Sequence, residues 1–165
     1  MYLLDASSMI EAKQRYYRFG LGAGRWYWAR LLEGNAAGLV ASANHMKGEI
    51  LAGEDELADW AKARGPEFWL PDTDDSVAAM RRLARWAQDR VTAGEIKQSA
   101  ATKFGSGDIY LVATALAGGH TVVTAEVPAP LAKNDIKMPD ACNAVGVPWT
   151  DQFTMLEDLE IQLGP

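Results

Sequence analysis

Short apolar runs that alternate with longer amphipathic stretches are the feature that most constrains the fold of this chain. Apolar or β-branched runs occupy residues 2–4, 38–42 and 121–124, and segments with helical periodicity lie between them. Strands that alternate with helices pair in parallel through right-handed crossovers, so this order predicts an α/β fold. We expect three layers, with a central parallel sheet of four to five strands flanked by helices.

Apolar spacing and cap residues predict the remaining elements. Ser7 is expected to cap a helix over residues 7–14, and a further short strand is expected near 136–138. The other expected helices cover 24–33, 44–51, 54–63, 74–92, 94–102, 109–118 and 151–162. The 74–92 helix is the clearest, because apolar residues repeat along it at helical spacing: Val77, Met80, Ala84, Ala87 and Val91.

Size, charge and cysteine content limit the class of protein. A chain of 165 residues with 48% hydrophobic content is expected to form a single domain over 1–165. A net charge of −6 argues against a protein that coats DNA regardless of sequence, since such a protein needs a basic face. The lone Cys142 supports neither a disulfide framework nor a cysteine zinc site, and we expect it to be buried. Without a signal peptide or a membrane-length apolar run, a cytoplasmic protein is expected.

Acidic residues stand where expected strands end or where helices lie beside those ends. They are Asp5, Glu49, Asp108 and Glu126. Ligands of open α/β sheets bind at the carboxyl edge of the strands, and carboxylates gathered there typically hold hard divalent cations. Two carboxylates about 5 Å apart repel by roughly 3 kcal/mol at an effective dielectric of about 20, so a cluster favours a bound cation. For a single residue such as Asp108, helix capping is the alternative.

Segments around these acids resemble PIN domains. They are residues 3–10 (LLDASSMI), 107–115 (GDIYLVATA) and 122–126 (VVTAE), with Glu49 at the remaining acidic position of the family. The chain departs from the family at Glu126, where most PIN domains carry Asp. Residues 11–13 (EAK), 16–17 (YY) and 137–142 (KMPDAC) are similar to a prokaryotic PIN-like subfamily akin to VapC-type toxins.

The resemblance implies an endoribonuclease that selects single-stranded RNA and uses Mg²⁺ or Mn²⁺. Asp5 and Asp108 would bind the ion directly, and Glu49 would be a ligand or a base that orients water. Glu126 would bind a second ion or act through water. Ser7 and Thr124 would position water or carboxylates by hydrogen bonding. The ions would lower the pKa of bound water and stabilise charge on the phosphate.

Partners follow from the same resemblance and from local composition. A toxin of this kind would be inhibited by a small antitoxin, and Trp26 with Trp28 is the pair expected at a partner surface. Lys13, Arg15 and Tyr16 suit phosphates and stacked bases, with a solvated surface as the alternative. No membrane contact is expected, and a homodimer is possible. A PIN-like module that binds RNA or protein without useful cleavage is the alternative function.

Overall fold

Five short parallel strands form the centre of the fold. The computed structural model describes residues 1–164, and its strands are β1 (Tyr2–Leu4), β2 (Val40–Ala43), β3 (Trp69–Leu70), β4 (Thr121–Val123) and β5 (Trp149–Thr150). Their order is β3-β2-β1-β4-β5, and each neighbouring pair is parallel. The first strand is therefore the central one, and the expected three-layer α/β fold with a parallel sheet is confirmed.

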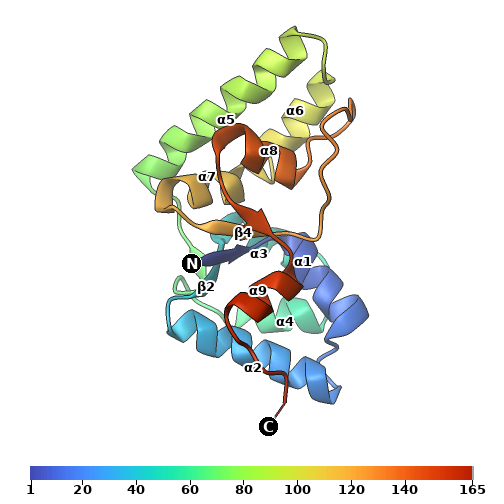
Figure 1. Cartoon of the computed structure of the whole chain (residues 1–165), viewed down its shortest axis with the longest axis vertical. Coiled ribbons are helices and arrows are strands. Elements are labelled where there is room, and N and C mark those ends of the chain that lie inside the picture. Colours follow the sequence, from blue (N-terminus) through green and yellow to red (C-terminus); the bar gives the residue numbers. More distant parts are fainter. Residues whose placement is uncertain (165) are drawn as a thin grey trace.

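Helices cover both faces of this sheet. Figure 1 shows α5, α6, α7 and α8 on one side and α2, α4 and α9 on the other. A π-helix (Ala12–Tyr16) continues α1 beyond the end of β1. The helices are α1 (Ala6–Glu11), α2 (Gly22–Ala36), α3 (Asn44–Leu51), α4 (Glu56–Lys62), α5 (Asp74–Thr92), α6 (Gln98–Gly105), α7 (Ile109–Gly118), α8 (Met138–Val145) and α9 (Gln152–Asp158).

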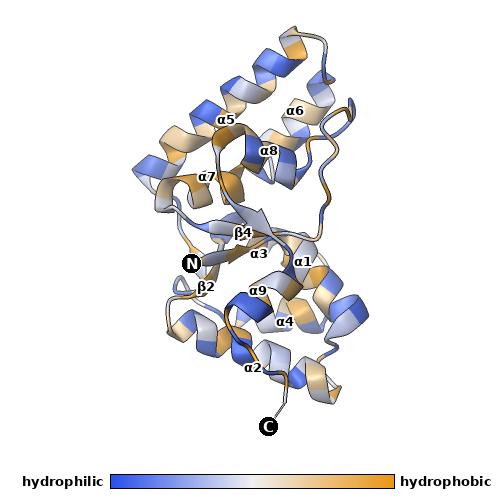
Figure 2. Ribbon diagram, in the orientation of Figure 1, coloured by the Kyte–Doolittle hydropathy of each residue, from blue (hydrophilic) through white to orange (hydrophobic). Residues whose placement is uncertain are grey.

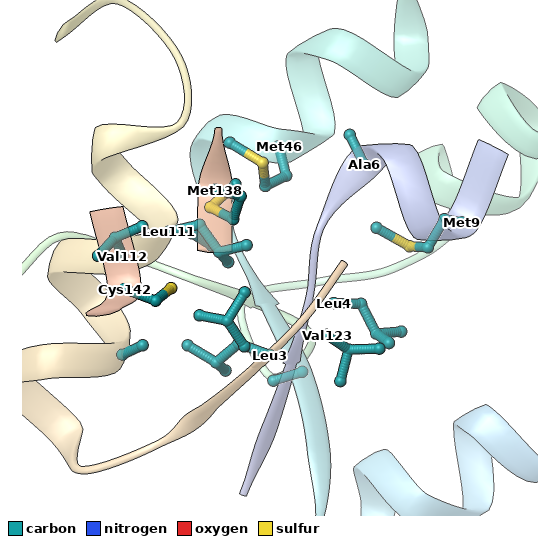
Figure 3. Close-up of a cluster of buried hydrophobic side chains, with 14 of the residues drawn as sticks. Leu3, Leu4, Ala6, Met9, Met46, Leu111, Val112, Val123, Met138 and Cys142 are labelled. Atoms are coloured by element: carbon teal, nitrogen blue, oxygen red, sulfur yellow. The ribbon is translucent and has the colours of Figure 1, made fainter. Parts of the chain in front are cut away.

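The central strand and α7 are buried because both are apolar on every side. Leu3 and Leu4 occupy successive positions of β1 and so point to opposite faces, yet both are inaccessible to solvent. Figure 2 shows α7 as a nearly continuous hydrophobic segment, whereas α5 alternates between hydrophobic and hydrophilic residues. Burying a leucine of this kind contributes about 1.5–3 kcal/mol. Figure 3 shows how β1, β4, α7 and α8 contribute to this cluster, in which Cys142 is buried as expected.

The expected strand near 136–138 is wrong. Met138 is instead the first residue of α8, which has Pro139 in its first turn and ends at Gly146 with a left-handed φ of 77°. Proline in the first turn and glycine just past the end are the ordinary signals of a helix. Two strands that were not expected, β3 and β5, form the two edges of the sheet.

Several helices begin at residues other than those expected, and α1 and α6 show why. Ser7 lies inside the first turn of α1, and Asp5 takes the N-cap position without a side-chain cap bond. The helix expected over 94–102 is α6, which begins at Gln98, because Gly94 adopts a φ of 73° just after α5 ends. Residues 94–97 are thus a connection.

The buried face of α5 matches the expected one only in part, since Ala87 is buried and Met80 and Val91 pack against the core. Val77 is 37% exposed and Ala84 is also exposed, whereas Ala79, Leu83 and Ala87 face the core. The helix packs on α7 through these small and apolar residues. Within residues 1–164, no helix has the length and apolar character that crossing a membrane requires.

Candidate metal centre at the carboxyl edge of the sheet

Sheet register places Asp5 beside Thr124. Leu4 pairs with Val123, and the backbone N–H of Asp5 donates to the carbonyl of Val123 at 2.8 Å. Asp5 and Thr124 are the next residues along these two strands. They therefore lie side by side at the carboxyl edge of the sheet. This is the edge at which open α/β sheets bind ligands.

Two hydroxyl groups hold the Asp5 side chain in place. Thr124 Oγ1 donates to Asp5 Oδ2 at 2.9 Å, and Ser7 Oγ donates to the same oxygen. The supporting roles expected of Ser7 and Thr124 thus have a geometric basis. No residue among 1–164 donates a hydrogen bond to the other oxygen, Oδ1, although Asp5 is only 3% exposed. A buried carboxylate is left with one oxygen free to bind a ligand.

Asp108 lies at the start of α7 but does not cap it. The residue already has helical φ and ψ angles, and its side chain makes no cap bond. Asp108 is partly buried, and the positive charge of Lys103 lowers its pKa in part. The capping alternative is therefore wrong for this residue, and its carboxylate has no scaffold role in the helix.

Glu49 reaches the site from α3, which docks on the turn before α7. His45, one turn earlier in α3, stacks on Tyr110 with ring centroids 3.8 Å apart, and its Nε2 lies 2.9 Å from the carbonyl oxygen of Ser106. A Cβ atom built on Gly107 would lie 3.5 Å from Glu49 Oε1, which places this carboxylate beside the turn that carries Asp108. Glu49 is exposed, so its side chain can turn toward a ligand.

Glu126 differs from the other three acids because both of its oxygens are engaged. Lys137 Nζ donates to Oε1 at 3.1 Å, and the backbone N–H of Met138 donates to Oε2 at 2.7 Å. Lys137 also donates to Asp135 at 2.9 Å, and Lys103 pairs with the same carboxylate at 3.1 Å. Glu126 thus anchors the N-terminus of α8, and a lysine supplies its counter-charge.

Burial and mutual repulsion raise the pKa of the two central acids. Burial is the main cause for Asp5, whose pKa rises to about 6 although its hydroxyl partners act in the opposite direction. Burial likewise raises the pKa of Asp108 to about 7, with further contributions from the charges of Asp5, Glu126 and Glu49. The pKa of Glu49 is also raised, mainly because the protein partly desolvates its carboxylate although the residue as a whole is exposed. All four acids therefore belong to one electrostatic site.

The donor chemistry of this site fits a hard divalent cation. Every candidate ligand is a carboxylate, and oxygen ligands are those that Mg²⁺ and Mn²⁺ prefer. Among residues 1–164, no three Asp, Glu, His or Cys side chains are already arranged to hold a metal ion. Asp5, Asp108 and the exposed Glu49 are the residues that would hold one.

The metal-free protein should become more stable as the pH falls. Asp5 and Asp108 have folded pKa values above the usual 3.8, so between about pH 4 and 7 the folded state binds more protons than the unfolded state. We expect the free energy of unfolding in EDTA to rise by about 3 kcal/mol between about pH 7.5 and pH 5. The lowered pKa of His120 opposes this gain below its usual value of 6.5.

Urea unfolding at several pH values measures the gain. The double variant Asp5→Asn, Asp108→Asn isolates it, because His120 and the other titrating groups are unchanged there. An equal pH dependence in wild type and double variant would contradict the raised pKa values.

Lys137→Met should destabilise the fold by about 1–3 kcal/mol. The substitution leaves Glu126 and Asp135 partly buried without their shared cation, and unpaired buried charges are costly. Lys62→Met is the matched control, because Lys62 forms an exposed ion pair with Asp59 in α4 and should change stability by about 0.5 kcal/mol or less. Equal losses in the two variants, measured by urea unfolding, would show that Lys137 acts only as a surface charge.

The residues expected to contact RNA lie on the π-helix that follows α1. Lys13 pairs with Asp55 at 2.8 Å, and Arg15 pairs with Glu11 at 3.2 Å. Tyr16 is 45% exposed and meets the ring of Phe153 edge to face, with centroids 5.1 Å apart. Tyr16 is thus available to a ligand, whereas Lys13 also joins the π-helix to the start of α4.

The partner surface expected around Trp28 is wrong. Trp28 is 3% exposed and stacks on Phe19 with ring centroids 4.5 Å apart. Its indole N–H donates to the carbonyl of Tyr17 at 2.7 Å, so the residue belongs to the core. Trp26 is only partly buried and lies under the guanidinium of Arg30.

Comparisons with known proteins give one finding. The sequence model of a family described as a domain of unknown function, DUF4411, matches residues 2–163. The comparisons with curated proteins and with solved structures gave no match.

Proposed function

The chain belongs to the DUF4411 family, and we propose that it is an endoribonuclease that hydrolyses phosphodiester bonds of single-stranded RNA with Mg²⁺ or Mn²⁺. The observation that carries the proposal is the free Oδ1 atom of the buried Asp5 at the end of the central strand. Burying a carboxylate is costly unless a partner satisfies it. Asp108 adds a second carboxylate, which makes no cap bond. Both acids are therefore available to bind a cation.

The chain's own residues would hold and orient such an ion. Ser7 and Thr124 fix one oxygen of Asp5 and so aim the other, while Asp108 approaches from the start of α7. When bound, the ion supplies a water of lowered pKa and stabilises charge on the phosphate. Because the pKa of Asp108 is near 7, part of its population is protonated at neutral pH, and ion binding releases that proton.

Glu49 and Glu126 would act differently from these two acids. Glu49 is exposed beside Asp108 and can bind the ion or orient the attacking water. The oxygens of Glu126 already accept hydrogen bonds from Lys137 and Met138, so its role is to hold α8 and to add negative charge. Lys103 and Lys137 place positive charge next to the acids, where the RNA phosphate would lie.

The resemblance to PIN domains supports the reaction class and suggests a biological setting. Its segments include Asp5, Asp108 and Glu126, all at the carboxyl edge of the sheet. On the same basis we propose that the protein is the toxin of a toxin–antitoxin pair, which would act in the cytoplasm expected from the sequence. A small antitoxin that offers Arg or Lys to the free carboxylates would inhibit it, because a fixed cation can satisfy the acids as a metal ion would.

A binding module without useful cleavage is the second candidate. It is favoured by the engagement of both Glu126 oxygens, which already accept hydrogen bonds from Lys137 and Met138. Such a module would bind RNA or a protein at the same edge but leave RNA intact in any divalent cation.

A cleavage assay separates the two candidates. A labelled single-stranded RNA and a duplex of the same sequence are incubated with the protein in Mn²⁺, Mg²⁺ or EDTA. The nuclease cleaves the single strand in Mn²⁺ or Mg²⁺ and leaves it intact in EDTA. Binding of the single strand without cleavage in either ion would overturn the nuclease and favour the module.

A further inference from the structure

A small cavity lies next to the candidate metal centre. Its volume is about 180 Å³, and Thr124 and Glu126 form part of its lining, so it adjoins the acidic edge of the sheet. Pockets that enclose drug-sized ligands measure roughly 300–1,000 Å³, and this cavity is therefore suited to a single ring system. Other residues that line it come from α1, β5 and α9 and include Glu11, Trp149, Gln152 and Phe153.

The buried Gln152 points to a polar ligand in this cavity. Its side chain is 3% exposed, and its Oε1 accepts a hydrogen bond from the Tyr27 hydroxyl at 3.4 Å. No residue among 1–164 accepts a hydrogen bond from its Nε2. Nε2 is not enclosed, because Trp60 Nε1 is the only enclosed side-chain atom without a partner in the described chain, and solvent in the cavity can reach it. A ligand that displaces this solvent would therefore have to offer Nε2 an acceptor.

Aromatic and acidic side chains also line the cavity, together with small and aliphatic residues. Trp149 and the 43% exposed Phe153 provide ring surfaces, and Tyr16 extends the aromatic surface beyond Phe153. Unstacked bases of single-stranded RNA bind to proteins by stacking on such rings. The carboxylate of Glu11 lines the same cavity, and Arg15 donates to its Oε1 at 3.2 Å. A carboxylate oxygen accepts more than one hydrogen bond, so Glu11 can also accept from a base.

From this juxtaposition we propose that the cavity receives one unstacked guanine base of the RNA substrate, next to the bond that is cleaved. The Watson–Crick edge of guanine carries two adjacent N–H donors and a carbonyl acceptor. Glu11 accepts from the donors, Gln152 donates to the carbonyl, and Trp149 or Phe153 stacks on the ring. Adenine, cytosine and uracil each lack two adjacent donors beside an acceptor on that edge.

An arginine side chain of a protein partner is the main competing occupant. It would satisfy Glu11 and stack on the aromatic rings, but a guanidinium has donors only. The spare N–H of Gln152 would then stay without an acceptor in a filled cavity, at the cost of an unsatisfied buried donor. Guanine satisfies both side chains, so the lining favours the base.

The proposal rests on the proposed nuclease function, and binding of uncharged nucleosides tests it separately. Guanosine, adenosine, cytidine and uridine are each titrated into wild-type protein in EDTA, and ¹H–¹⁵N NMR follows the Gln152 side-chain amide and the Trp149 indole. We expect guanosine to shift both signals and to bind about tenfold more tightly than the other nucleosides, the scale of a good bidentate base contact. Equal binding of all four, or no shift at these two groups, would overturn the proposal.

Two variants and a matched control locate the recognition. Glu11→Gln and Gln152→Leu should each reduce the preference for guanosine to about twofold or less. Glu33→Gln should keep it, because Glu33 forms a similar exposed pair with Arg30 away from the cavity. If Gln152→Leu does not fold, Glu11→Gln decides alone: an unchanged preference overturns the proposal. Displacement of guanosine by an arginine amide at lower concentration would assign the cavity to a protein partner instead.

Failure of this proposal is distinguishable from failure of the nuclease function. Selective guanosine binding without RNA cleavage in Mn²⁺ would support the guanine site and overturn the proposed nuclease function. RNA cleavage in Mn²⁺ with equal binding of the four nucleosides would support the nuclease function and overturn the proposed guanine site.

Discussion

Asp5→Asn and Asp108→Asn should each lower the rate of RNA cleavage by about 10³-fold or more. Each substitution removes one carboxylate at the sheet edge. Asp5 has one oxygen that accepts no hydrogen bond from residues 1–164, and the side chain of Asp108 makes no cap bond. A bound ion is expected to stabilise the transition state by several kcal/mol, and about 1.4 kcal/mol corresponds to a tenfold change in rate. Initial rates in Mn²⁺ with a labelled single-stranded RNA measure the effect.

Folding of the same variants should not suffer. Raising the pKa of Asp5 from 3.8 to about 6 implies a cost of about 3 kcal/mol for its charged form, since one pKa unit is about 1.4 kcal/mol. Asparagine is neutral and nearly isosteric, and its carbonyl oxygen can still accept from Ser7 and Thr124. Metal-free Asp5→Asn should therefore be as stable as wild type or more stable in thermal unfolding at neutral pH.

Asp59→Asn provides the control for this pair. Asp59 lies in α4, where its side chain is 77% exposed and paired with Lys62, and the substitution should leave cleavage unchanged. Wild-type rates in Asp5→Asn or Asp108→Asn would contradict the assignment. A loss of activity that accompanied unfolding would point to a structural role, and thermal unfolding distinguishes that case.

The sequence was sufficient to predict the centre of the site because local pattern determines it. An apolar run followed by Asp5 places that residue at the end of a strand, and Asp108 opens a segment apolar enough to be a buried helix. Parallel strands end at a common edge, so the positions of Asp5, Thr124 and Glu126 follow from chain order alone. The bounds of α5 and α7 were also close, because Thr73 caps the start of α5 and Gly119, with a left-handed φ, ends α7.

Features that depend on tertiary packing were not predictable in this way. The edge strands β3 and β5 contain two residues each, too few to show an alternating pattern. The pairing of Glu126 with Lys137 depends on where α8 docks, and Trp28 is buried only because α2 packs against Phe19 and the core. Gln152 carried no signal in the sequence, since its importance comes from burial beside a cavity.

Mn²⁺ should raise the melting temperature of the wild-type protein by about 5–10 °C. An ion that binds only the folded state at about 100 times its Kd stabilises that state by about 2.7 kcal/mol, and a domain of this size gains about 2–4 °C for each kcal/mol. The shift should be smaller at about pH 6 than at about pH 8, because Asp108, with a pKa of about 7, must lose its proton for the ion to bind. Thermal unfolding with and without millimolar Mn²⁺ measures it.

Variants of three of the acids should reduce this shift to different extents. Asp108→Asn should abolish it and Glu49→Gln should reduce it, because both carboxylates have no hydrogen-bonding role that competes with an ion. Glu126→Gln should retain most of the shift, since Lys137 and Met138 already occupy its oxygens. A larger loss in Glu126→Gln than in Glu49→Gln would show that Lys137 releases Glu126 to bind the ion. If Mn²⁺ left the melting temperature of the wild-type protein unchanged, this result would contradict the metal centre and favour the binding module.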